Sequence, residues 1–578
     1  MAMKKLEKFF PGRQEDSKNT SPFVSPEYDN GERDSPEFTR KPRFNESADA
    51  GGGGATKKTV VVIEDDKQRK TTGKKKGNTG PVSDVKRKIT KAKEDKSAVL
   101  DLSRMDIASI PMGIRELSSQ LEELYLYSNR LTTVPSETGM LSKLKTLALQ
   151  ENVITSLPDE LRKLSALKVL DLRHNKLKEI PDVVYALTSL QTLYLRFNKI
   201  SIVSMRLENL LNLTTLSLRE NKIKELPSAI GALTQLLLLD ASHNHLEFIP
   251  EEIGNCVNLT TLDVQHNNLT KLPSSVGNLT QLKRFGLRYN KLSELPAEIV
   301  LCVHLEELSL ENNAIVALPQ DLYGCLIKLC SVQLSRNSFE TFPVSQPDHL
   351  SHMNSLNIEH NSITKIPHGI LSKAPAVTSL VISHNQLATL PLDFGTWIGL
   401  RELDLGSNQL QVLPEDIQKL VKLERLVLSN NLLRHLPKGI CALRELQVLE
   451  LDGNRLESLV SEISYLRSLK RLNVQSNRIT YLPRGLGLLL SLEHLSAGEN
   501  NLMEIPTEIG SLENLEELYI NDNPNLQNLP YELALCKRLA LMSVEGCPLG
   551  RLPLHAVEGG PSAIIQHLKY DSPYKGVR

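Results

Sequence analysis

One apolar pattern, LxxLxLxxNxLxxLP, returns with nearly constant spacing through most of this 578-residue chain. It is complete from Leu121 to Pro135, where Val134 occupies the last leucine position. Its asparagine occurs 18 times, and the interval is 23 residues apart from three intervals of 24. Two atypical units, with Met105 and Cys547 in the asparagine position, bring the total to 20. One unit cannot bury its own leucines, so successive units must stack on one another.

This period and leucine spacing are typical of the leucine-rich repeat. In each LxL the two leucines point into the core of a short strand, and such strands stack in parallel about 4.8 Å apart. The asparagine is expected to bond buried turn backbone, and the Leu-Pro step ends the strand side because proline lacks a donor. We predict an α/β leucine-rich-repeat solenoid, a horseshoe of about 20 repeats of 23–24 residues. Its concave side is a parallel β-sheet and its convex side carries short helices or 3₁₀ turns.

The first 96 residues differ from the repeats in composition. They contain 23 Lys/Arg and 16 Asp/Glu, although the whole chain has 68 of each, and 14 of these basic residues lie in 57–96. The stretch has too few large apolar side chains to offset its chain entropy. We therefore predict a disordered basic tail over 1–96, the solenoid over 97–560, and a C-terminal helical cap and tail over 561–578. Within the tail, the polar segment 84–98 is expected to cap the first repeat.

The residue after the second leucine of each LxL forms a column on the predicted concave face. From the second repeat it contains Tyr127, Gln150, Arg173, Arg196, Arg219, Ser242, Gln265, Arg288 and Glu311. Consecutive arginines on adjacent strands repel one another, and nearby acids compensate in part, namely Glu151, Asp171, Glu220, Asp240 and Asp263. In later repeats the column changes to residues such as Gly406, Ser429 and Asp452.

Arginine and tyrosine among fixed acids are the composition of protein-binding surfaces. The alternative is a solvated polar face, but the restriction of the pattern to repeats two to ten favours binding. The predicted partner-binding residues are Tyr125, Tyr127, Glu151, Asp171, Arg173, His174, Tyr194, Arg196, Arg219, Arg288 and Tyr289.

Signals of catalysis are missing from the sequence. Histidines precede the repeat asparagine at 174, 243, 266, 360 and 384, but they lie too far apart or lack a third ligand for a metal. Cys256, Cys302 and Cys325 are expected to be small core residues. We expect no enzyme activity, no cofactor and no metal. The start of the chain lacks a signal segment and no apolar run reaches membrane-spanning length, so a cytoplasmic protein is expected.

Several stretches go beyond the repeat consensus. They are 124–129, 170–176, 193–198, 287–290, 390–397, 514–525 and 559–562. Over 98–578 the chain resembles the suppressor-of-clear family, the cytosolic leucine-rich-repeat scaffolds of the Ras–Raf–MAP-kinase pathway. The long divergent tail indicates an invertebrate member.

The resemblance implies a non-catalytic scaffold. It would join a GTP-loaded Ras-type GTPase, chiefly M-Ras, to the catalytic subunit of protein phosphatase one, and the complex would dephosphorylate Raf kinase and promote MAP-kinase signalling. The concave tyrosines and arginines would face the GTPase or the phosphatase, with Asp171 and Glu151 on the phosphatase side. Ala2 stands where myristoylation requires glycine, so a cytoplasmic protein is expected to reach the plasma membrane through its partner, and a nuclear pool is left open. No nucleic-acid partner is expected, because the basic stretch 67–93 lacks interleaved aromatic residues.

The family carries a phosphatase-docking motif in its tail, in which a basic residue precedes two apolar side chains that pair as an added strand. The corresponding residues are Lys58, Val60 and Val62, with valine where an aromatic residue is expected. The segment 41–44 is a weaker match, and a chance apolar run is the alternative. The basic stretch 67–93 is open to nucleic acid, anionic lipid, an importin or solvent alone. The competing function is an adaptor for other proteins at the membrane, such as a cell-polarity scaffold.

Overall fold

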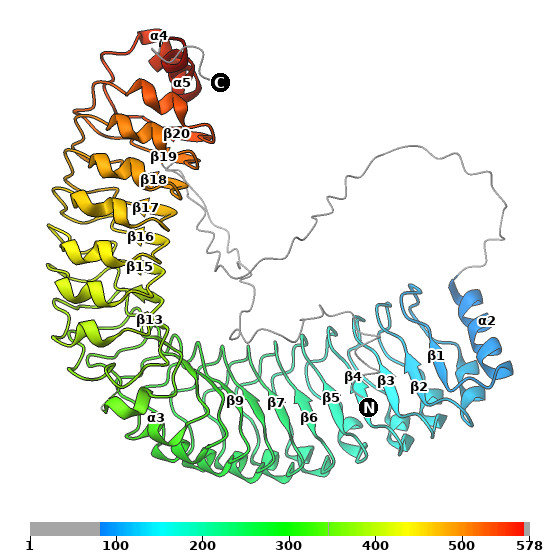
Figure 1. The fold of residues 1–578 in the computed structure, drawn as a ribbon. Coiled ribbons are helices and arrows are strands. Elements are labelled where there is room, and N and C mark those ends of the chain that lie inside the picture. Colours follow the sequence, from blue (N-terminus) through cyan, green and yellow to red (C-terminus); the bar gives the residue numbers. More distant parts are fainter. Residues whose placement is uncertain (1–80, 345, 572–578) are drawn as a thin grey trace, which may run out of the picture. The chain divides into compact units, whose positions relative to one another are not determined.

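The computed structural model describes residues 81–344 and 346–571, and these form a curved solenoid (Figure 1). The described residues contain one sheet of 20 strands. Each strand pairs in parallel with the next one along the chain, and the repeats stay in register, so that Leu124 lies opposite Leu147. The predicted leucine-rich-repeat solenoid is confirmed.

Every strand has three residues. The strands are β1 (Val99–Asp101), β2 (Glu123–Tyr125), β3 (Thr146–Ala148), β4 (Val169–Asp171), β5 (Thr192–Tyr194), β6 (Thr215–Ser217), β7 (Leu238–Asp240), β8 (Thr261–Asp263), β9 (Arg284–Gly286), β10 (Glu307–Ser309), β11 (Ser331–Gln333), β12 (Ser355–Asn357), β13 (Ser379–Val381), β14 (Glu402–Asp404), β15 (Arg425–Val427), β16 (Val448–Glu450), β17 (Arg471–Asn473), β18 (His494–Ser496), β19 (Glu517–Tyr519) and β20 (Leu541–Ser543).

The convex side carries mostly 3₁₀ turns, as predicted. Many of them follow the proline of the Leu-Pro step, as η7 follows Pro250, whose φ of −68° and ψ of 150° lead the extended chain into the turn. They are η1 (Met112–Leu117), η2 (Ser136–Met140), η3 (Asp159–Lys163), η4 (Val184–Ala186), η5 (Met205–Asn209), η6 (Ser228–Ala232), η7 (Glu251–Asn255), η8 (Ser274–Asn278), η9 (Ala297–Leu301), η10 (Pro347–Leu350), η11 (Phe394–Thr396), η12 (Glu415–Lys419), η13 (Lys438–Ala442), η14 (Ser461–Tyr465), η15 (Arg484–Leu488), η16 (Thr507–Ser511) and η17 (Tyr531–Leu535).

The core is a continuous column of buried leucines, and a ladder of asparagines runs beside it. Asn221 shows the bonding that most repeats share. Its Oδ1 accepts from the Ile200 amide at 3.0 Å, and its Nδ2 donates to the Leu195 and Leu218 carbonyls at 3.0 and 2.9 Å. Each asparagine therefore joins its own turn to the preceding repeat and satisfies backbone groups that water does not reach.

The N-terminal repeat is covered by a helix, α2 (Pro81–Glu94). Val85, Ile89 and Ala92 form its apolar stripe and are buried against η1 and β1. This confirms the cap expected over 84–98. It also corrects the predicted end of the tail at residue 96, because an ordered helix precedes that point. Residues before 81 lie outside the described part of the chain.

Two helices cover the last repeat, α4 (Leu554–Glu558) and α5 (Gly560–Asp571). Ile564 and Leu568 of α5 are buried, and α5 packs against η17. Helix α5 overlaps the segment 561–578, for which the sequence analysis predicts a helical cap and tail.

The three 24-residue units hold their additional residue outside the sheet. Their strands continue the register without a break, with Val332 opposite Leu356 and Leu356 opposite Leu380. On the convex side, a short helix α3 (Leu322–Cys325) replaces the usual 3₁₀ turn. These observations match a longer convex connection.

The cysteine prediction holds at two of three positions. Cys256 and Cys302 are buried in a leucine position, and their thiols donate to the Ile230 and Val276 carbonyls. Cys325, in contrast, is exposed. It was wrongly assigned to the core because it stands one residue before Leu326, the residue that occupies the inward position.

Candidate functional site: a basic and aromatic concave surface

The predicted partner-binding residues gather at the ends of strands β2 to β9. We use the term basic face for the surface formed by Arg173, Arg196, Arg219 and Arg288 together with the aromatic and imidazole rings next to them. Arg173, Arg196 and Arg219 are half-buried and Arg288 is buried, so the column is less exposed than expected. Gln150, Ser242 and Gln265 in the same column are also buried. The arginines are therefore held in place by the surface rather than extended into solvent.

A second column, next to the arginines, has a left-handed backbone that the sequence analysis did not predict. In most repeats the residue before the asparagine has positive φ, for example 53° at His174, 56° at Phe197 and 55° at Tyr289. The His174 amide donates to the carbonyl of Arg196, in the next repeat, at 2.9 Å. This bond joins the turns of the two repeats. His stands at the position before the asparagine five times, Ser and Glu three times each, Asn twice, and Asp and Gly once each; His, Asn, Asp and Gly tolerate the left-handed region. That recurrence was the available signal.

This backbone brings rings of successive repeats face to face. His174 stacks on Phe197 with centroids 4.3 Å apart. His243, His266 and Tyr289 form a longer stack, with centroid separations of 4.1 and 4.3 Å. Burial, and then the charge of Arg219, lower the pKa of His243 to about 4. Burial, and then His243 and Arg288, lower the pKa of His266 to about 4. The stack is therefore neutral at neutral pH, and the arginines alone supply positive charge here.

Arg173 is fixed by its own repeat. Its Nη2 donates to Oδ2 of Asp171 at 2.7 Å, and its Nε lies 3.0 and 3.1 Å from the two carboxylate oxygens. Asp171 is 1% exposed. The guanidinium also lies over the Tyr194 ring, 5.1 Å from its centroid. The predicted compensation of arginine by a local acid is present at this position.

Arg196 and Arg219 are held differently. The Nε atoms of both are buried and have no hydrogen-bond partner among the described residues. Arg196 lies over the Phe197 ring, 4.6 Å from its centroid, and the Nε of Arg219 lies 3.7 Å from a carboxylate oxygen of Glu220. Burial, and then the charge of Arg219, lower the pKa of Arg196. Two poorly compensated, partly desolvated cations on neighbouring strands favour an acidic partner group.

Acids lie beneath the far end of the basic face. Asp240 and Asp263 are opposite each other on β7 and β8, and Asp263 is opposite Gly286 of β9. Burial, and then Asp240, raise the pKa of Asp263 to about 7. A Cβ at Gly286 would come within 2.6 Å of Asp263 Oδ1, so glycine leaves room for this carboxylate.

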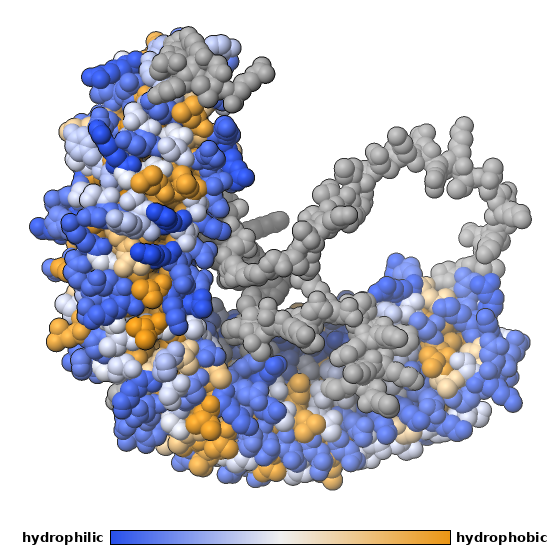
Figure 2. Space-filling model, in the orientation of Figure 1, coloured by the Kyte–Doolittle hydropathy of each residue, from blue (hydrophilic) through white to orange (hydrophobic). Residues whose placement is uncertain are grey.

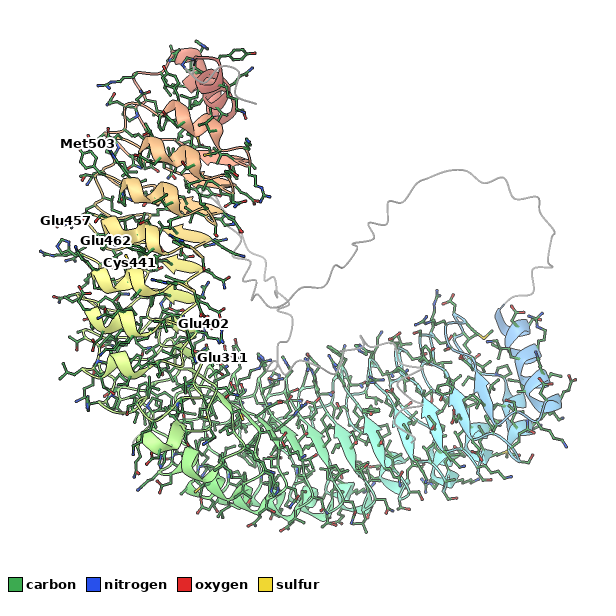
Figure 3. The ribbon with its side chains drawn as sticks, viewed as in Figure 1. Glu311, Glu402, Cys441, Glu457, Glu462 and Met503 are labelled. Carbon is green, nitrogen blue, oxygen red and sulfur yellow. The ribbon has the colours of Figure 1, made fainter. Side chains whose placement is uncertain are left out.

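The tyrosines of the site are buried or half-buried. Tyr125 is 4% exposed, and its hydroxyl donates to Glu123 at 2.9 Å, so it does not lie open on the face as expected. Tyr127 is half-buried near the Arg104 guanidinium. The Tyr289 hydroxyl lies 3.4 Å from Glu311, whose side chain projects on the strand side of the solenoid (Figure 3).

Other predicted residues lie at the margin or outside. Glu151 is exposed and accepts a hydrogen bond from Ser128. Lys58, Val60 and Val62, the suggested phosphatase-docking segment, lie outside the described residues. The face that Figure 2 shows is largely hydrophilic, with separate apolar spots.

Within 81–344 and 346–571, no three His, Cys, Asp or Glu side chains are grouped as they would be around a metal ion. Among the helices of the same part of the chain, none has the length and apolarity to cross a membrane.

Comparison with known families agrees with the fold. The family described as "Leucine rich repeat" matches residues 119–177, 142–200, 188–246, 257–315 and 327–387. The family described as "Leucine-rich repeat region" matches residues 376–545. The chain is a leucine-rich-repeat protein. Its repeats are matched from the second unit almost to the last.

Named relatives match over a short part of this leucine-rich-repeat chain. It is 60% identical over 57 residues to "Leucine-rich repeat protein SHOC-2" of Danio rerio. It is 58% identical over 57 residues to "Leucine-rich repeat protein soc-2 homolog" of Nematostella vectensis, and 53% identical over 55 residues to "Leucine-rich repeat protein soc-2" of Caenorhabditis elegans. Each match spans 10% of this chain and 10% of the relative.

Solved leucine-rich-repeat structures cover more of the chain at lower identity. The "Plant peptide hormone receptor RGFR1 in complex with RGF2" is 29% identical with a TM-score of 0.62, over 76% of each chain. A structure titled "Crystal structure of a TDR receptor" is 25% identical with a TM-score of 0.62, over 79% of this chain and 86% of the receptor.

Proposed function

We propose that this leucine-rich-repeat protein is a non-catalytic signalling scaffold whose basic face binds a GTP-loaded Ras-type GTPase, M-Ras. With the catalytic subunit of protein phosphatase one, the assembly directs dephosphorylation of Raf kinase and promotes MAP-kinase signalling. The protein acts in the cytoplasm and reaches the plasma membrane with its partner.

The pair of under-compensated arginines, Arg196 and Arg219, is the observation that carries the proposal. Two cations that repel each other on adjacent strands persist at a cost in stability, and an acidic partner removes that cost. The effector-binding surface of Ras-type GTPases is acidic, so it offers the matching charge. The neighbouring rings supply rigid contact area without adding charge.

The named relatives support the proposed function over a small part of the chain. The names SHOC-2 and soc-2 agree with the scaffold family that the sequence resembles, over a tenth of the chain. On the basic face, Asp171 and Glu151 are assigned to the phosphatase side. The tail segment with Lys58, Val60 and Val62 supplies a second phosphatase contact by strand pairing.

A pull-down with purified full-length protein tests the proposal. The bait is M-Ras loaded with a GTP analogue or with GDP, in the presence of the phosphatase-one catalytic subunit. We expect recovery of all three proteins with the GTP analogue only. In the variant Arg173→Glu/Arg196→Glu we expect recovery to fall by at least tenfold, because two attractive contacts become repulsive.

The matched control is Arg425→Glu/Arg471→Glu, which makes the same exchange on exposed positions of β15 and β17. It should leave recovery unchanged, and circular dichroism should show both variants folded. Equal recovery with GDP, or equal loss in both variants, would refute the proposed site.

The second candidate is an adaptor for other protein partners at the membrane, such as a cell-polarity scaffold. This candidate is kept because one fold can serve different functions. A solenoid of the same type is found in the plant peptide hormone receptor RGFR1 in complex with RGF2. Recovery of neither GTPase nor phosphatase would favour this candidate.

A further inference from the structure

Helix α2 presents a basic surface that the proposed function does not use. It covers the first repeat with Val85, Ile89 and Ala92, and none of the described elements covers its opposite side (Figure 1). At 100° per residue, Arg87 and Lys91 lie on that outer side, and Lys86 and Lys93 lie on one flank. The helix therefore offers an uncovered row of cations at the N-terminal end of the solenoid.

The charges on α2 are only partly compensated. Lys86, Arg87, Lys88, Lys91 and Lys93 are all exposed. Arg87 pairs with Asp84 at 3.1 Å and Lys93 with Glu116 at 2.8 Å, whereas Lys88 donates to the Asp101 carbonyl. Both ion pairs are solvent-exposed, and each offsets the charge of one cation. Asp84 and Glu94 are the acids on the outer side, and the excess of cations belongs to the helix as a whole, which has five Lys or Arg residues and two Asp or Glu residues.

We infer that the outer face of α2 binds an anionic lipid surface. Lysines predominate, and lysine is a flexible point charge whose stem lies along a membrane while its ammonium reaches the headgroups. Each basic residue near such a surface raises the partition coefficient by about fivefold. The basic residues are spread over a convex helix, as contact with an extended charged plane requires.

Other polyanions fit this surface less well. Nucleic-acid sites combine a groove with aromatic rings or arginines, and α2 is a convex helix without aromatic residues and with one arginine. An acidic protein partner would need an apolar anchor at the centre of the contact. The apolar residues Val85, Ile89 and Ala92 are already buried against the first repeat.

This inference goes beyond the proposed function and does not depend on it. It amends the expectation that the chain meets the membrane only through its GTPase. A weak contact of α2 with lipid would fix the orientation of the solenoid at the surface where a lipid-anchored partner lies. The sequence places a further cluster, Lys74 to Lys76, just before the helix.

Vesicle co-sedimentation of the full-length protein tests the inference. The vesicles are phosphatidylcholine alone or phosphatidylcholine mixed with phosphatidylserine. We expect binding only to the mixed vesicles, weakening as salt is added. The variant Lys86→Gln/Arg87→Gln/Lys91→Gln should bind at least tenfold more weakly. Glutamine has a helix propensity close to that of lysine and arginine, so α2 should persist.

Two comparisons make the result decisive. The variant Lys74→Gln/Lys75→Gln/Lys76→Gln removes the same charge from the tail, and it should reduce binding less than the α2 variant. Loss of binding in the tail variant alone would overturn the inference. Tighter binding to a duplex oligonucleotide than to the mixed vesicles, sensitive to the α2 substitutions, would also overturn it. Pull-down of the GTPase by the α2 variant should be unchanged in solution.

Discussion

Strands β4–β9 and β14–β19 have the same backbone geometry, but their outward side chains form different surfaces. Leu216 and Leu449 are equally buried, and the asparagine ladder has the same bonds in both regions. In the second region, charges pair across strands, as Arg425 does with Glu402 at 3.5 Å. On the basic face, the Nε atoms of Arg196 and Arg219 have no hydrogen-bond partner among the described residues. Inward residues therefore determine the fold, and function is expected where outward charges do not neutralise one another.

The largest effect should be the same in both regions. Asn221→Ala and Asn431→Ala each remove an acceptor and a donor that serve buried backbone. We expect each to lower the free energy of unfolding by about 2–4 kcal/mol, measured by urea denaturation. Asn212→Ala, which removes one exposed bond, is the control. Clearly unequal losses would show that the two regions differ in fold stability as well as in surface.

Glycines on the two surfaces should respond differently to a methyl group. In Gly286→Ala the new Cβ would lie 2.6 Å from Asp263 Oδ1, whereas in Gly406→Ala the nearest atom is at 3.2 Å. We expect the first substitution to destabilise by about 1–3 kcal/mol, and the second to be near neutral. Thermal denaturation of both variants measures the contrast, and equal shifts would contradict it.

Replacing one arginine in each region should change stability in opposite directions. Arg196→Gln removes a repulsion with Arg219, so we expect a gain of about 0.2–1 kcal/mol. Arg425→Gln breaks a pair with Glu402 and should lose up to about 1 kcal/mol. The Arg196 variant should bind the GTPase more weakly while being more stable. A loss of stability in both variants would argue against an unfavourable repulsion between Arg196 and Arg219.

A further difference is the pH dependence that three groups of the basic face contribute. His243 and His266 have pKa values lowered to about 4 from 6.5, so the unfolded chain takes up protons first as pH falls from 7 to 4. These groups therefore reduce stability in acid. Asp263, with its pKa raised to about 7 from 3.8, opposes them, because in this window the folded state takes up its proton first.

The double variant His243→Gln/His266→Gln should lose less stability between pH 7 and pH 5 than the parent protein. Asp263→Asn should lose more. Urea midpoints at the two pH values measure both, and His435→Gln, an exposed histidine elsewhere, is the control. The same pH response in all three variants would show that His243, His266 and Asp263 do not cause the pH dependence.

Much of the fold follows from the sequence because each repeat contacts only the repeats next to it along the chain. The strands, the asparagine bonds and the 3₁₀ turns follow from single positions of the pattern, and Asp171 was correctly assigned as an acid that compensates the arginines. Cys325 was misplaced by one residue of register, although Leu326 already fills the inward position. The helix α2 was anticipated only as a cap, because its stripe of Val85, Ile89 and Ala92 is short.

Details of the site depend on backbone geometry that composition does not contain. Tyr125 and Tyr127 look alike in the sequence, yet Tyr125 turns back onto Glu123 and Tyr127 lies near Arg104. The stack of His243, His266 and Tyr289 requires the left-handed turn before each asparagine. Stacking of neighbouring rings is a property of two adjacent turns and is absent from either repeat taken alone.

The asparagine ladder has a mechanical consequence. Because each asparagine is bonded to its own repeat and to the preceding one, an applied force meets the same set of bonds at each successive repeat. Stretched between its ends, the solenoid should come apart one repeat at a time, starting from whichever cap yields first. Each 23-residue step releases about 80 Å of chain. The molecule would then extend in a series of similar steps, as a graded tether between whatever is fixed to its two ends.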